Sequence, residues 1–176
     1  MAISAEFVNP FIEAAVAVAE KVAGIKMRRG HLAARRQPDP SYGVCIIVGV
    51  YGFLTGQVVY SMKKDLADKF VDHMLQGCTG VERESLYADT LGELANMITG
   101  NATAILNKKK EVALGITTPA VATGMDLNIS LVNNIPTLVL GLYSQFGPIE
   151  INVALKEGTS GDAARIAAGS HDSGSV

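Results

Sequence analysis

The 176-residue sequence has little cysteine, no long apolar run and no excess of one charge. Its two cysteines, Cys45 and Cys78, stand far apart and outside any C-x-x-C motif, which argues against a disulfide framework or a zinc site. Gly, Pro or a charged residue interrupts every apolar run before the roughly 20 residues that a membrane span needs. The formal net charge of −2 gives no support for a nucleic-acid partner. We therefore expect neither membrane insertion nor nucleic-acid binding.

Motifs for other kinds of chemistry are also missing. The opening residues lack the basic leader of a secretory signal, and glutamates interrupt their apolar positions, so we expect a cytoplasmic protein. No G-x-S-x-G motif or phosphate-cradling loop is present. The three histidines, His31, His73 and His171, share no metal-ligand spacing, and we expect ordinary structural roles for them.

Hydrophobic periodicity divides the chain into helix-like and strand-like segments. Three helices are expected: one that opens at Asn9 and Pro10 and ends at Gly24, one over 65–77, and a long one over 84–107. Strand-like runs are expected as a hairpin over 42–62 and in the segments 112–124, 125–132, 136–145 and 148–155. This order predicts a single α/β or α+β domain over 1–156, with helices packed on a mainly antiparallel sheet. Residues 157–176 are small and polar enough to form a mobile tail.

The basic segment 25–36 lies between the first helix and the hairpin. Residues 26 to 36 contain five Lys or Arg, which could bind an anion. An exposed edge strand protected by its charges is the simpler explanation.

The long helix carries residues that helix interiors usually avoid, in a regular pattern. At 100° per residue, four of them fall within about 60° of one another and form a polar stripe: Asp89, Glu93, Asn96 and Gly100. Six apolar residues lie on the opposite side and should face the core: Leu91, Leu94, Ala95, Ile98, Ala102 and Ile105. The helix is therefore expected to bury one face and to offer the polar stripe on the other.

A solvated surface would explain the polar stripe without any function. Propensity argues against that interpretation, because Asn is a mediocre helix former and Gly costs about 1 kcal/mol relative to Ala in a helix interior. A face shaped by solubility alone would carry Glu, Lys and Ala. Gly100 has its own structural alternative, since it could admit a crossing helix or mark a local bend near Asn101.

The polar stripe also has a recognisable spacing. Asp89-x3-Glu93-x2-Asn96 is followed after 22 residues by Pro119. This pattern resembles the D/S-x3-E-x2-N-x22-P signature of the CheX/CheC/FliY family of chemotaxis phosphatases. Further landmarks match CheX-like members of that family: Asn9-Pro10-Phe11, the glycines Gly49, Gly52 and Gly56, Ser61-Met62 and Met74-Leu75. The resemblance covers roughly residues 4 to 156 and implies a CheC-like fold.

The resemblance also implies a substrate, the aspartyl phosphate of a CheY-like response regulator receiver domain. An asparagine amide neither takes a proton at neutral pH nor attacks as a nucleophile, so Asn96 must complete a site on another protein. In this family the receiver contributes Mg²⁺, a lysine and the acyl phosphate, and we expect no cofactor held by this chain. Asn96 is expected to orient the attacking water, as glutamine does in GTP hydrolysis, and Glu93 to pair with the receiver's lysine.

Three further residues are expected to support this chemistry. Asp89 would support the start of the polar stripe, and Gly100 would let the partner's backbone come close. Pro119 matches the signature, and a structural role at the entry to a strand is expected for it.

The resemblance distinguishes two kinds of family member. CheC-like members carry two copies of the signature, whereas the first helix here offers Asn9-x3-Glu13-x2-Val16, with Val where the second asparagine is needed. One active face per chain resembles CheX, whose relatives form homodimers through strands of a continuous sheet, and a homodimer is therefore expected. The alternative function is a non-catalytic docking or switch-complex module of the same fold that binds a response regulator.

Overall fold

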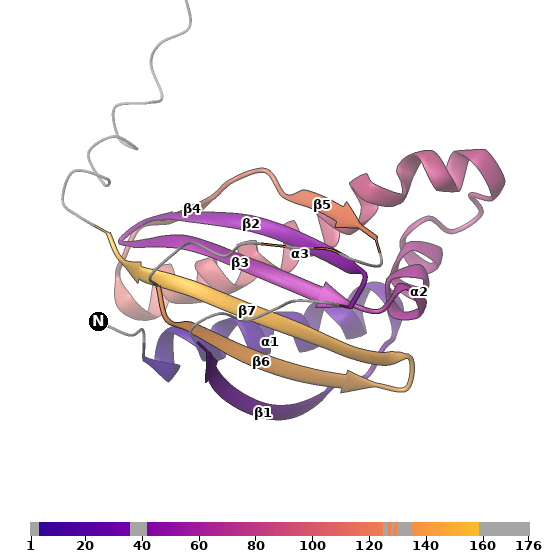
Figure 1. Cartoon of the computed structure of the whole chain (residues 1–176). Helices are drawn as coiled ribbons and strands as arrows, with labels where there is room; N and C mark the ends of the chain where they lie inside the picture. The colour runs from indigo at the N-terminus through magenta and orange to yellow at the C-terminus, as the bar shows by residue number, and fades with distance from the viewer. Residues whose placement is uncertain (1–3, 36–41, 125–126, 128, 130–134, 159–176) are drawn as a thin grey trace, which may run out of the picture.

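The computed structural model describes residues 4–35, 42–124, 127, 129 and 135–158. Within these residues, three helices lie on one face of a seven-stranded antiparallel sheet (Figure 1). The helices are α1 (Ala5–Ala23), α2 (Lys64–Met74) and α3 (Gly80–Lys110). The strands are β1 (Arg28–Arg35), β2 (Val44–Gly52), β3 (Leu54–Met62), β4 (Leu114–Ile116), β5 (Ala120–Thr123), β6 (Thr137–Ser144) and β7 (Gly147–Glu157). The predicted α+β architecture is confirmed.

The core lies between the sheet and the three helices. The strands follow the order β1-β6-β7-β3-β2-β4, and β5 also pairs with β2. One row of paired residues crosses the helix-covered face of the sheet: Leu32, Leu140, Ile151, Tyr60, Ile46 and Val121. The four central members of this row are buried. Each central strand thus contributes one buried residue of this row to the face that the helices cover.

β1 forms one edge of the sheet, as the basic segment predicts. Among the described strands it pairs with β6 alone. Arg28, Arg29 and Arg35 are exposed along this edge. The expected exposed edge strand is thus confirmed, and protection of this edge by its charges stays a prediction.

The start of α1 differs from the sequence-based expectation. α1 begins at Ala5, and Pro10 lies inside the helix rather than near its first position. Tertiary contacts hold the additional turn: the rings of Phe7 and Phe53 lie 6.4 Å apart, and Lys110 of α3 forms an ion pair with the first-turn glutamate. The expected start is wrong by about one turn because these contacts join segments that are distant in the sequence.

The C-terminal boundary also differs by a short distance. β7 extends to Glu157, and the backbone N–H of Gly158 donates to the Phe53 carbonyl at 2.8 Å, so the predicted tail over 157–176 starts too early. The rest of that tail and most of the predicted strand 125–132 lie outside the described residues. None of the helices described here combines the length and the apolarity that crossing a bilayer requires.

Candidate functional site

α3 buries one side against the core and carries the polar stripe on the other, where Asn96 and Gly100 are half-buried. The helix runs three to four residues further at each end than the predicted 84–107. Most of the residues predicted to face the core are buried: Leu91, Leu94, Ala95, Ile98 and Ala102. Ile105 is the exception, because the buried side continues through Thr99 and Thr103 to Leu106. Asp89 and Glu93 are exposed on the opposite side.

A buried hydrogen bond fixes α3 to the sheet close to Asn96. The Tyr60 hydroxyl of β3 donates to Thr99 Oγ1 at 2.8 Å, and the Thr99 hydroxyl donates to the Ala95 carbonyl at 2.7 Å. Burial raises the pKa of Tyr60 well above its ordinary value, so its hydroxyl remains a donor at physiological pH. This hydrogen bond therefore fixes α3 to the sheet within one turn of Asn96.

The segment 114–121 runs beside α3, and side chains fix it at two points. Asn107 of α3 accepts a hydrogen bond from the Leu114 N–H at 2.9 Å and donates to the Leu114 carbonyl at 3.3 Å. Thr117 donates its N–H to the Gly49 carbonyl and accepts from the Gly49 N–H through Oγ1, both at 2.9 Å. This segment is thus tied to α3 at its start and to β2 in its middle.

A β-bulge interrupts the pairing of this segment with β2. Two ladder pairs enclose it: Val50 with Ile116, and Ile47 with Ala120. Between these pairs the three residues 117–119 lie opposite the two residues 48–49, which is the residue count of a β-bulge. Because the alternation of side chains changes at the extra residue, the neighbours Thr118 and Pro119 both face α3.

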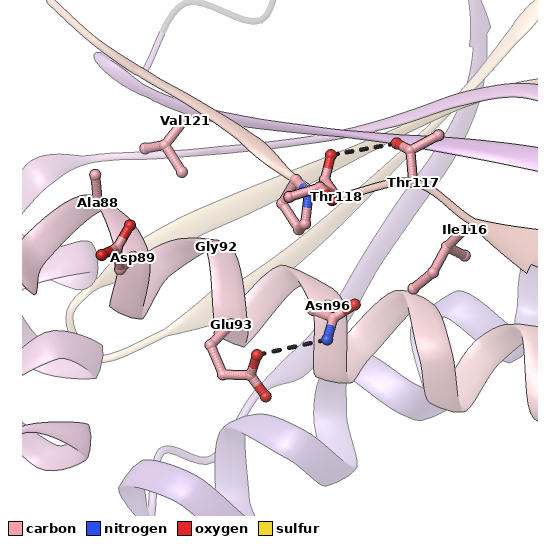
Figure 2. A pocket seen from close by; sticks show the side chains of 10 residues that line it. Ala88, Asp89, Gly92, Glu93, Asn96, Ile116, Thr117, Thr118 and Val121 are labelled. Atoms are coloured by element: carbon pink, nitrogen blue, oxygen red, sulfur yellow. Dashed lines mark hydrogen bonds between the residues drawn. The ribbon is translucent and has the colours of Figure 1, made fainter. Parts of the chain in front are cut away.

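A groove of about 500 Å³ lies between α3 and the bulge (Figure 2). It is lined by Ala88, Asp89, Gly92, Glu93, Asn96, Ile116, Thr117, Thr118, Pro119 and Val121. Asp89, Glu93, Asn96 and Pro119 of the signature therefore line one groove, although Pro119 is distant from the other three in the sequence. Pro119 directly precedes β5, which is the strand entry expected for it.

Gly92 is a groove residue that the sequence reasoning missed. A Cβ at this position would lie 3.8 Å from Pro119 Cβ and 3.9 Å from Val121 Cγ2, so the helix backbone lies directly beneath the bulge. A larger side chain would occupy the groove or separate its two sides. The available signal was its place in the helix, one turn after Asp89 and beside the polar stripe.

The electrostatics of the groove favour a cation. Asp89 and Glu93 contribute two carboxylates, and among the described residues that line the groove none is basic. The Asn96 amide donates from Nδ2 to Glu93 Oε2 over a long 3.4 Å, as Figure 2 shows. Such a weak contact leaves both side chains free to exchange partners. The groove can thus accept an ammonium group, but it disfavours a free phosphate ion.

Gly100 lies outside the groove. A Cβ at this position would be 4.0 Å from Ile116 Cδ1, which places the glycine beside β4. Its expected role in admitting a partner's backbone stays a prediction, as does the supporting role of Asp89. Nowhere in the described part of the chain do three His, Cys, Asp or Glu side chains gather as a metal site would require.

The signature-like positions of α1 are engaged within the chain. Asn9 accepts a hydrogen bond from Arg29 at 3.2 Å, and Glu13 forms an ion pair with Lys109 at 3.7 Å. Val16 packs against the core at the position where an asparagine would be needed. These contacts favour the interpretation of α1 as a structural element without a second site.

Comparison with known proteins identifies relatives of this chain. The family model of the chemotaxis phosphatase CheX matches residues 44–142, which include every residue of the groove. The CheY-P phosphatase CheX of Thermotoga maritima is 26% identical over 155 residues, which are 88% of this chain and 98% of that protein.

Solved structures share the fold. The chemotaxis protein CheX from Desulfovibrio desulfuricans superimposes with a TM-score of 0.76 at 24% identity, over 87% of this chain and 99% of that chain. A complex of CheX with CheY, BeF₃ and Mg²⁺ from Borrelia burgdorferi gives a TM-score of 0.69 at 25% identity, over 86% and 98% of the two chains. These matches confirm the CheC-like fold.

Proposed function

The chain belongs to the chemotaxis phosphatase CheX family, and on this premise we propose that it hydrolyses the aspartyl phosphate of a CheY-like receiver domain. A relative of nearly the same length is a CheY-P phosphatase, and another has been crystallised with CheY, BeF₃ and Mg²⁺. BeF₃ imitates a phosphoryl group, so that relative engages a receiver in its phosphorylated form. The substrate of this chain is therefore proposed to be a phosphorylated protein.

The convergence of Glu93 and Asn96 in one groove, whose described lining has no basic side chain, carries the proposal. A self-sufficient phosphatase needs a nucleophile, a base or a metal near the phosphate. The described lining of this groove offers an amide, two carboxylates and the hydroxyls of Thr117 and Thr118. Such a set cannot bind a phosphate by itself, but it can complete a site that already holds one.

Asn96 is proposed to position the attacking water. Its amide has both an acceptor and donors, so it can fix the orientation of a water molecule in line with phosphorus. The water oxygen bonds to phosphorus, the bond from phosphorus to the aspartyl oxygen breaks, and its electron pair returns to the receiver's carboxylate. The products are inorganic phosphate and the receiver with an unmodified aspartate side chain. Positioning alone can lower such a barrier substantially.

Glu93 is proposed to dock the groove onto the receiver. It lies one turn before Asn96 on the exposed side of α3, where its carboxylate can pair with the receiver's lysine. Asp89 would add negative charge at the end of the same groove. Mg²⁺ is proposed to come from the receiver, which is consistent with the Mg²⁺ in the complex of a relative with CheY.

Phosphate release from labelled receivers tests this function. We expect the full chain to accelerate the loss of phosphate from at least one member of a panel of phosphorylated CheY receivers in Mg²⁺, and chelation to abolish the effect. Acetyl phosphate and phenyl phosphate should not be hydrolysed by the chain alone, because its groove lacks a cation. Accelerated hydrolysis of these small phosphate compounds without a receiver, or no acceleration with any receiver, would contradict the proposal.

A further inference from the structure

We propose that the receiver domain contacts both sides of the groove, and that Thr118 in the β-bulge is a specificity-determining contact residue opposite Glu93 and Asn96. This inference rests on the proposed function and extends it from α3 to the segment 116–121. Figure 2 shows Thr118 on the segment across from α3, the helix that carries Glu93 and Asn96, and all three residues line the groove. The side chain is exposed, so a partner can reach it without rearrangement of the chain.

The size of the groove supports contact with both sides. A volume of about 500 Å³ holds a few side chains but not a domain. A receiver that brings its lysine to Glu93 and its phosphoryl group to Asn96 would place these groups in the groove that both residues line together with the bulge. The loops that carry them would then rest on the exposed Thr118.

The bulge is also built to keep this side in place. The paired hydrogen bonds between Thr117 and Gly49 fix the residue before Thr118, and Pro119 restricts the backbone after it. A Cβ at Gly49 would lie 2.8 Å from Thr117 Cγ2 and 2.9 Å from Thr117 Oγ1, so glycine is what allows this close contact. Bulges commonly redirect a side chain beside a functional site, and this one aims Thr118 into the groove.

The experiment compares two matched substitutions on the same edge of the sheet. Thr118→Arg places a long cation inside the groove, where it would compete with the receiver's lysine for Glu93. Thr123→Arg adds the same group at an exposed threonine of β5 that does not line the groove. Affinity is measured by titration calorimetry against the Mg²⁺ and BeF₃ form of the receiver on which the wild-type chain acts fastest.

We expect Thr118→Arg to weaken binding at least about tenfold, and Thr123→Arg to change it by less than about twofold. Equal losses for the two variants, or wild-type affinity for Thr118→Arg, would overturn the proposal. Circular dichroism checks the fold, and Thr118→Gln replaces the arginine variant if that variant does not fold. If the wild-type chain dephosphorylates the receiver and Thr118→Arg binds it as tightly as the wild type, the proposed contact is wrong but the proposed function stands. A wild-type chain that neither binds nor accelerates any receiver would remove both.

Discussion

At the scale of single residues, Glu93 and Asn96 divide the proposed work between charge and position. Glu93 is exposed and its contact with Asn96 is long, so it has little to do for the stability of α3. Its substitution should therefore affect the partner rather than the fold. This separation makes the residue suitable for a test of docking.

We expect Glu93→Lys to weaken binding to the Mg²⁺ and BeF₃ form of the receiver, and turnover with it. If the ion pair with the receiver's lysine is buried, the loss is about 2 to 5 kcal/mol, because the partner's charge would be left unpaired. Glu84→Lys, on the same helix but outside the groove, makes the same change of charge and serves as the control. Unchanged affinity in Glu93→Lys by calorimetry would remove Glu93 from the interface.

The sequence predicted the site residues that lie together on a single helix. The positions of Asp89, Glu93 and Asn96 on the exposed side of α3 follow from helical geometry, since one helix holds all three. Thr117 and Thr118 could not be predicted as groove residues, and for Gly92 the local signal was limited to its place beside the polar stripe. Their places depend on the approach of α3 to the bulge, which is a tertiary contact that no local pattern records. Gly100 belongs to the polar stripe by its periodicity, yet it does not line the groove.

At the scale of elements, the bulge between β4 and β5 explains the distance between Asn96 and Pro119 in the signature. After α3 ends, β4 runs back beside the same helix. Two hydrogen bonds with Asn107 hold the start of β4 there. The extra residue in the bulge then turns Pro119 over Gly92. The α+β order of elements and the basic edge strand could be predicted from sequence patterns. The one-residue change of register at the bulge could not, because no local pattern marks it.

We expect Gly49→Ala to lower the free energy of unfolding by about 1 to 3 kcal/mol, because the new methyl group would press on Thr117. Urea denaturation measures this loss. The double variant Gly49→Ala/Thr117→Ser removes the nearest methyl group and should recover part of the stability. A single variant as stable as the wild type would contradict a tight contact between β2 and the bulge.

At the scale of the whole molecule, we propose a homodimer with two copies of the groove. A two-fold axis would place the same surface on each subunit. The charged β1 edge is protected, so pairing is expected away from it. Light scattering at micromolar concentration should give about twice the 18.5 kDa chain mass. A monomer under these conditions would exclude this assembly without affecting the proposed chemistry.

The central claim is that Asn96 acts in turnover and not in docking. Replacement of its amide should slow hydrolysis while the rest of the groove still binds the receiver. This outcome separates a phosphatase from a docking module of the same fold, because docking needs a complementary surface but no oriented water.

The most direct measurement compares Asn96→Ala with the wild type in two assays on the same receiver. Single-turnover phosphate release should fall by about 100-fold or more, since misplacement of a reacting group has an effect of that order. Affinity for the Mg²⁺ and BeF₃ form should stay within about threefold of the wild-type value, which corresponds to less than 1 kcal/mol. An Asn96→Ala variant that dephosphorylates the receiver as fast as the wild type would contradict the account.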